Sequence, residues 1–119
     1  RLKRGEAPVI FGDGGQALDY VYVDDVVAGT IAAMESGTAT DGEVLNLGSG
    51  EATNIRDLTK IMTEVSGKAI APAFGPADWT AGTSRAGDNA KARRLLGWSP
   101  TVDLREGLAR TWGWVSAAR

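Results

Sequence analysis

Three short apolar runs, each followed directly by a helical or turn pattern, constrain the fold of this chain most. The run Val9 to Phe11 ends in the glycine-rich turn of residues 12–15. The run Tyr20 to Val23 leads into apolar residues at helical spacing over residues 24–36, a helix that begins at an aspartate pair. A third run, Val44 to Leu47, is closed by a Gly-Ser-Gly turn. This succession of strands and helices predicts an α/β fold.

The second half of the chain predicts three helices and one long loop. Each helix has a polar capping residue at its start, and a glycine follows the first two. Residues 68–87 contain a possible strand from Ala69 to Phe74 and then a loop too long for a simple connection. The helices cover residues 54–67, with Asn54 as cap, and 88–97, with Asp88 as cap, and the last opens on Asp103.

The order of these elements predicts one domain with an incomplete sheet. A self-sufficient parallel sheet needs several consecutive βαβ units, and the sequence lacks them. We therefore expect a mixed α+β fragment, a single domain over residues 1–119, whose sheet is completed elsewhere. The chain starts with Arg1 rather than methionine, which favours a segment of a longer protein; a mature protein trimmed by a protease is the alternative.

The composition removes several classes of function. With no cysteine and no histidine, the chain lacks thiol nucleophiles, imidazole bases and the usual zinc ligands. A net charge of −2 with interspersed signs argues against a nucleic-acid partner, and no apolar run approaches the roughly 18 residues of a membrane span. The lack of cysteine and of a signal segment favours a cytoplasmic location.

Four segments in order carry a resemblance to a known family. They are IFGDGGQALDYVYVDDVV, EVLNLGSG, SRAGDNAKARRLLGWSP and LREGLARTWGW, and they span almost the whole chain. Together they are similar to the C-terminal third of the NAD-dependent epimerase/dehydratase family, the extended short-chain dehydrogenases that modify nucleotide sugars. The resemblance implies a C-terminal substrate-binding domain without its Rossmann core, and a nucleotide sugar, of UDP type first, as the ligand.

The catalytic groups of that family are missing from this chain. The resemblance implies a Tyr-x-x-x-Lys pair and NAD bound on a Gly-x-x-Gly-x-x-Gly turn. The two tyrosines, Tyr20 and Tyr22, are followed four residues later by Asp24 and Val26, and neither glycine-rich stretch has the dinucleotide spacing. We therefore predict no catalytic, cofactor-binding or metal-binding residue here, with NAD held by the longer enzyme.

The resemblance implies four substrate-binding residues. Val9 and Phe11 would bind the nucleotide base through the main chain, although a hairpin with Phe11 in the core is an equal alternative. The arginine that many members place before the aspartate of the QALDY segment is Leu18 here, which cannot pair with a diphosphate. Arg85 and Asp88 reproduce an Arg-x-x-Asp spacing for diphosphate and ribose, but a helix cap is the favoured interpretation of Asp88.

Other polar and aromatic residues have simpler interpretations. The Asp24–Asp25 pair predicts a helix cap and a favourable dipole partner rather than an acid–base site. Asp19 is expected to accept main-chain hydrogen bonds beside its strand. Trp98 and Trp112 are expected in the core, Trp79 is a candidate wall of the ligand site, and Gln16 and Asn46 are polar neighbours of the strands.

The sequence thus predicts the nucleotide-sugar-binding portion of an NAD-dependent epimerase or dehydratase, with epimerase favoured and no activity of its own. The alternatives are a non-catalytic nucleotide-sugar-binding module and a dimerisation module. The resemblance also implies that the strand at Val44 to Leu47 packs against the Rossmann sheet in such enzymes. Without that sheet it would expose an unpaired edge, so self-association is expected.

Overall fold

The chain forms four α-helices and five short strands in residues 1–118, the part described by a computed structural model. The helices are α1 (Val23–Glu35), α2 (Ile55–Ser66), α3 (Ala90–Leu96) and α4 (Leu104–Ala117). The strands are β1 (Val9–Phe11), β2 (Ala17–Asp19), β3 (Ala52–Asn54), β4 (Ala73–Gly75) and β5 (Ser84–Arg85), and the 3-10 helices are η1 (Leu2–Arg4) and η2 (Gly37–Thr40). This is the mixed α/β architecture that the sequence predicts.

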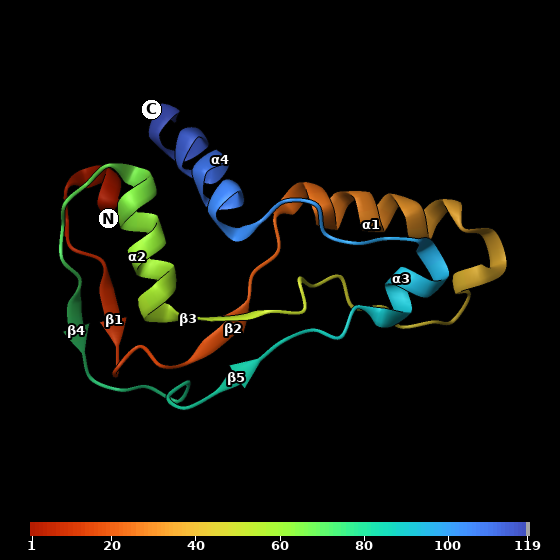
Figure 1. Ribbon diagram of the computed structural model, residues 1–119, viewed down its shortest axis with the longest axis horizontal. Coiled ribbons are helices and arrows are strands. Elements are labelled where there is room, and N and C mark those ends of the chain that lie inside the picture. The colour runs from red at the N-terminus through yellow and green to blue at the C-terminus, as the bar shows by residue number, and fades with distance from the viewer. Residues whose placement is uncertain (119) are drawn as a thin grey trace.

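The molecule is elongated, with principal extents of 49, 34 and 19 Å. At one end, α2 and α4 pack together beside β1 and β4, and at the other end α1 packs against α3 (Figure 1). The strands β2, β3 and β5 connect the two ends. Among the described residues, no helix combines the length and the apolar character needed to cross a membrane.

Two small sheets organise the strands. In the first, β1 runs parallel to β4, with Ile10 opposite Phe74. In the second, β2 lies in the centre, antiparallel to β3 and parallel to β5, with Leu18 opposite Arg85. The second sheet therefore brings the QALDY segment next to the loop before α3.

The helix boundaries follow the local signals in the sequence. Asn54 accepts a hydrogen bond from the main-chain N–H of Asp57 at 2.8 Å, and Asp103 accepts one from Glu106 N–H at 2.8 Å. The glycine after α2, Gly67, has a φ of 65°, the left-handed conformation that ends a helix without a Cβ penalty. The predicted caps of α2 and α4 are confirmed.

The buried core is small and lies in two places. Ile10 of β1 is 2% exposed and faces α2, while the buried Trp98 follows α3 and donates its indole N–H to the main-chain oxygen of Asp25 at 2.8 Å. The core position predicted for Trp98 is confirmed. Trp112 of α4 is only half-buried and lines a cavity together with side chains of α2.

Three sequence predictions of strands were displaced or wrong. The strand predicted at Tyr20 to Val23 lies earlier, at β2, and α1 already begins at Val23. The position of β2 depends on its pairing with β3 and β5, which are distant in the sequence. No strand forms at Val44 to Leu47, because no described segment pairs with it. The strand predicted at Ala69 to Phe74 is confined to β4, and β5 lies inside the predicted loop.

The aspartate pair at the start of α1 does not cap it. The N-cap position is Tyr22, and no side-chain cap hydrogen bond forms there. Instead, Asp25 points inward, is 3% exposed, and accepts hydrogen bonds from Thr101 and Val102 in the connection between α3 and α4. The cap interpretation was therefore wrong for Asp25, whose partners lie about 76 residues away.

Candidate functional site

One edge of β1 is open. Toward β4, the Pro8 oxygen accepts the N–H of Ala73 at 2.9 Å, and Gly12 donates its N–H to the Gly75 oxygen at 3.1 Å. Main-chain groups of successive residues in a strand point to opposite edges, so those of Val9 and Phe11 face away from β4. No described strand pairs with that edge.

The side chain of Phe11 is not part of the core. It is 49% exposed, and Gly75 opposite it leaves room, because a Cβ there would lie 3.2 Å from the Phe11 ring. The hairpin alternative is therefore wrong, since β1 pairs with β4 and Ile10 is the buried residue. Gln16 donates its amide to the Phe11 oxygen at 3.0 Å, while its own buried Oε1 has no partner among residues 1–118.

The glycine-rich turn after β1 is held by charged groups. Asp13 accepts the N–H of Gly15 at 2.8 Å, and the Arg56 guanidinium contacts both the main-chain oxygen and the carboxylate of Asp13. The Gly15 hydrogen bond, followed by the Arg56 charge, lowers the pKa of Asp13. Gly14 has a φ of 74° and lies so close to Ile10 that a Cβ would approach its side chain to 2.8 Å.

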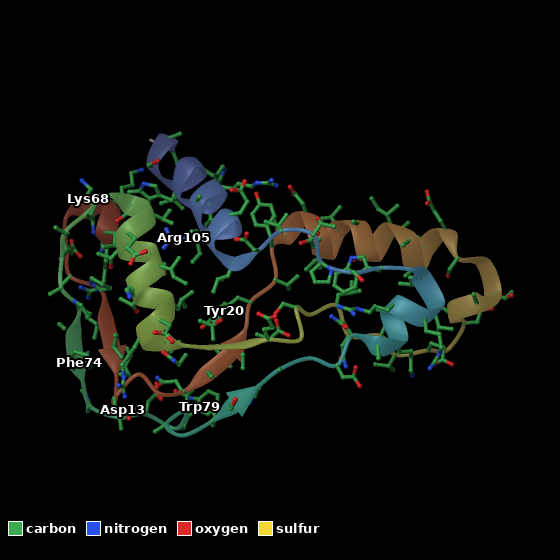
Figure 2. All side chains as sticks on the ribbon, in the orientation of Figure 1. Asp13, Tyr20, Lys68, Phe74, Trp79 and Arg105 are labelled. Carbon is green, nitrogen blue, oxygen red and sulfur yellow. The ribbon has the colours of Figure 1, made fainter. Side chains whose placement is uncertain are left out.

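Arg85 lies across the sheet from Leu18. The two residues are register partners on β2 and β5, and both side chains are exposed. The guanidinium carbon of Arg85 lies 5.9 Å from the centroid of the Trp79 ring, within the range of a cation–π contact. Figure 2 shows Trp79 in the loop that precedes β5. Sequence reasoning singled out all three residues but could not predict their proximity, which depends on strand register.

Asp88 serves the start of α3. Its Oδ1 accepts the N–H of Ala90 at 2.9 Å, although the N-cap position is Asn89. Its main-chain oxygen accepts the side-chain amide of Asn46 at 3.2 Å. The N-cap position predicted for Asp88 is therefore wrong by one residue, although the Asp88 carboxylate does bind the N–H of Ala90, the first residue of α3.

Asp19 joins three segments near this region. Its Oδ1 accepts the N–H and hydroxyl of Ser49 at 2.8 and 2.6 Å, and its Oδ2 accepts the N–H groups of Gly50 and Gly87 at 2.9 and 3.0 Å. Burial would raise the pKa of Asp19, but the hydrogen bonds from Ser49, Gly87 and Gly50 together lower it. The prediction that Asp19 accepts main-chain hydrogen bonds is confirmed.

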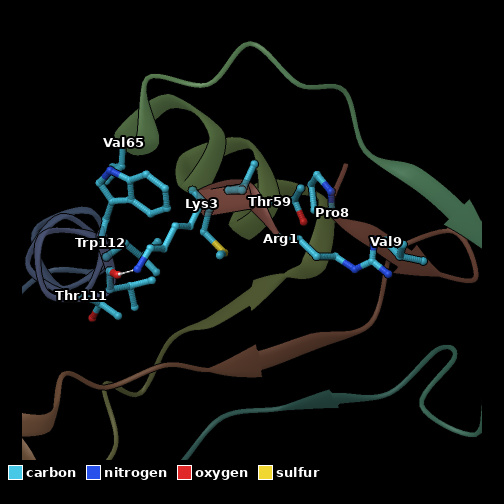
Figure 3. Close-up of a pocket in the computed structure, with 12 residues that line it drawn as sticks. Arg1, Lys3, Pro8, Val9, Thr59, Val65, Thr111 and Trp112 are labelled. Carbon is cyan, nitrogen blue, oxygen red and sulfur yellow. Dashed lines mark hydrogen bonds between the residues drawn. The ribbon is translucent and has the colours of Figure 1, made fainter. Parts of the chain in front are cut away.

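The predicted site residues do not share one cavity. The largest cavity described, about 450 Å³, lies between η1, α2 and α4 and is lined mainly by apolar side chains (Figure 3). Val9 lines it, whereas Phe11, Arg85 and Asp88 do not. Lys3 at its rim donates to the main-chain oxygens of Val115 and Ala118, a favourable cation at the C-terminal end of α4. In residues 1–118, no group of three or more acidic, histidine or cysteine residues is arranged to hold a metal ion.

The architecture is that of the C-terminal part of sugar-nucleotide epimerases. A UDP-glucose 4-epimerase from Thermotoga maritima, solved with UDP-glucose, matches 97% of this chain with a TM-score of 0.89 and 42% identity. A UDP-glucuronic acid 4-epimerase from Bacillus cereus, solved with UDP-glucuronic acid and NAD, matches 96% with a TM-score of 0.84 and 34% identity. In each case the chain covers 36% of the solved protein.

Sequence comparison agrees with the structural likeness. The UDP-glucose 4-epimerase of Mycolicibacterium smegmatis is 39% identical over 110 residues, which are 92% of this chain and 34% of that protein. Residues 1–111 match the family described as GDP-mannose 4,6 dehydratase. The chain therefore belongs to this family of NAD-dependent epimerases and dehydratases within the extended short-chain dehydrogenases. It spans about a third of the length of these relatives.

Proposed function

We propose that this chain is the nucleotide-sugar-binding portion of an NAD-dependent sugar-nucleotide epimerase that acts on a UDP-sugar in the cytoplasm. The observation that carries the proposal is the agreement over 97% of the chain with the Thermotoga maritima epimerase solved with UDP-glucose. The Bacillus cereus protein, solved with both UDP-glucuronic acid and NAD, supports NAD as the cofactor of the complete enzyme. The proposal assigns the catalytic groups and the NAD site to the rest of that enzyme, so the 119 residues bind substrate without converting it.

The roles of the site residues follow from their geometry. The open edge of β1 offers the main-chain groups of Val9 and the N–H of Phe11 to the edge of the base, which needs donors and acceptors at fixed positions, while the Phe11 oxygen already accepts the Gln16 amide. Arg85 supplies the positive charge for the diphosphate, because Leu18 opposite it carries none. Asp88 uses Oδ1 for the helix, which leaves Oδ2 for the ribose hydroxyls.

Replacing Arg85 by alanine is expected to weaken UDP binding about 10- to 100-fold, since a hydrogen-bonded charge pair contributes roughly 1.5–3 kcal/mol. Isothermal titration calorimetry of the chain with UDP, TDP and GDP measures the affinity and the preferred base. Arg94→Ala, which removes an exposed arginine of α3, is the matched control and should leave the affinity unchanged. UDP binding that survives Arg85→Ala unchanged would remove Arg85 from the site, and no binding by the unaltered chain would contradict the proposal.

A second candidate function, self-association, rests on an exposed stripe along α1. The stripe consists of Val23, Val27, Ile31 and Met34, all of them exposed although their spacing is that of a buried helix face. The unpaired run Val44 to Leu47 adds Val44 to the exposed apolar surface. Contiguous apolar surface of this kind is typical of an interaction site.

The unaltered chain is expected to form dimers at high concentration in sedimentation velocity experiments, because association would bury the α1 stripe. Ile31→Glu places a charge in the centre of the stripe and should shift the distribution to monomer. Ala28→Glu, on an exposed flank of the same helix, is the control and should leave the dimer intact. A monomer at high concentration for the unaltered chain would disprove self-association.

A further inference from the structure

We propose that Trp79 is a positioning residue that holds the Arg85 guanidinium over the β2–β5 sheet, ready to bind the diphosphate of a nucleotide sugar. This inference rests on the proposed function and gives a specific role to Trp79, which the sequence suggested only as a wall of the ligand site. The Trp79 indole fixes the orientation of the Arg85 side chain, and the Arg85 guanidinium binds the ligand. Three features of the structure support this arrangement.

The first feature is the place of Arg85 in the sheet. Register partners on neighbouring strands point to the same face, so the side chains of Leu18 and Arg85 rise side by side, with strands about 4.8 Å apart. Leu18 contributes no charge, and Ser84 is the other residue of β5. Among the paired residues of β2 and β5, Arg85 therefore supplies the positive charge.

The second feature is the lack of an acidic partner for Arg85. Several arginines of the chain, among them Arg4, Arg56 and Arg105, form ion pairs with carboxylates. Within residues 1–118, Arg85 forms no ion pair, and its contact is the Trp79 ring at 5.9 Å. The contact joins Arg85 to the π face of the indole, which accepts no N–H proton in the way a carboxylate does, so we infer that guanidinium N–H donors remain free for a phosphate.

The third feature is the loop that presents Trp79. Asp78 accepts the main-chain N–H of Thr80 at 2.8 Å and also its hydroxyl, and these hydrogen bonds lower the pKa of Asp78. Thr83 donates its N–H to the Thr80 oxygen at 3.0 Å. Two consecutive turns thus hold the loop next to β5, while the Trp79 side chain itself is 79% exposed. The Trp79 indole therefore does not contribute to the hydrophobic core.

The test compares the affinities of UDP and uridine for the 119-residue chain and its variants. Trp79→Leu removes the π face but keeps an apolar side chain, and we expect UDP affinity to fall about two- to fivefold, the size of an exposed cation–π contact. Uridine lacks the diphosphate, so its affinity should not change. Trp79→Phe keeps an aromatic face and should retain most of the UDP affinity.

A double-mutant cycle with Arg85→Ala separates positioning from direct contact. In the Arg85→Ala background, Trp79→Leu should have no further effect on UDP affinity, because the group that it positions is gone. Trp114→Leu is the matched control, since this tryptophan of α4 is 75% exposed, and it should leave UDP affinity unchanged. Equal melting temperatures of the variants confirm that folding is intact.

Each other outcome overturns the inference. A loss of uridine affinity in Trp79→Leu would show that the indole contacts the base directly. An unchanged UDP affinity in Trp79→Leu, or an equal loss with and without Arg85, would show that Trp79 does not position the guanidinium. If the unaltered chain binds no UDP, both the proposed function and this inference fail, whereas UDP binding without a Trp79 effect overturns the inference alone.

Discussion

Replacing Asp25 by alanine is expected to lower the free energy of unfolding by roughly 3 kcal/mol, because it leaves main-chain donors without an acceptor. Oδ1 accepts the N–H and hydroxyl of Thr101 at 3.0 and 2.7 Å, and Oδ2 accepts the N–H of Val102 at 3.0 Å. Burial would raise the pKa of Asp25, but these hydrogen bonds outweigh it and lower the pKa, so the carboxylate is the stable form. The carboxylate thus fastens the start of α1 to the segment that leads into α4.

The neighbouring aspartate provides the control for this prediction. Asp24 shares the same helix turn and is exposed, with its carboxylate 3.9 Å from the Arg110 guanidinium. Asp24→Ala should change the stability by no more than about 0.5 kcal/mol, as exposed ion pairs and surface substitutions usually do. Urea denaturation followed by circular dichroism measures both values. If the two substitutions lowered the free energy of unfolding equally, the loss would come from the helix dipole, which both aspartates share, and not from the Asp25 hydrogen bonds.

Where a structural signal is local, the sequence was sufficient to predict it. Asn54 and Asp103 cap helices through residues three positions away, and Gly97 ends α3 in the left-handed conformation with a φ of 63°. The strand at Val9 to Phe11 was predicted with its correct bounds, because the glycines that follow it mark the turn. The family was also predicted, since four motifs in order carry that information along nearly the whole chain.

Where the decisive partner is distant, the sequence was not sufficient. The aspartate pair at the start of α1 has the composition of a cap, and no local signal could place the partners of Asp25 at residues 101 and 102. The run Val44 to Leu47 has the composition of a strand but finds no partner among residues 1–118. In the candidate site, the pairing of Leu18 with Arg85 depends on strand register in the same way. These features depend on tertiary contacts that a pattern of single residues does not encode.

Replacing Asp19 by asparagine is expected to lower the free energy of unfolding by about 2 kcal/mol near pH 6, because one carboxylate oxygen becomes an amide that cannot accept a hydrogen bond. If the remaining oxygen stays with Ser49, the N–H groups of Gly50 and Gly87 face the new amide donor. Gly48 packs so closely that a Cβ on it would lie 2.6 Å from Asp19 Oδ2, so the turn has little room to adjust. The substitution should also make Gly87 more mobile, and Gly87 lies in the loop that joins Arg85 of β5 to α3.

The pH dependence of this difference distinguishes a charged acceptor from a mere packing role. The folded-state pKa of Asp19 is lowered, whereas an unfolded aspartate titrates near about 3.9. The carboxylate therefore contributes its full stability above about pH 4 and loses it as the pH falls through the lower folded-state pKa. The gap in stability between the parent chain and Asp19→Asn should narrow as the pH falls below about 4. Asp25, whose pKa is also lowered, is present in both proteins and cancels from the difference.

The control is Asp41→Asn, at an exposed position, which should have the same free energy of unfolding as the parent chain at pH 6. A gap for Asp19→Asn that stays constant from pH 6 to pH 2 would mean that shape alone, without the charge, determines the role of Asp19.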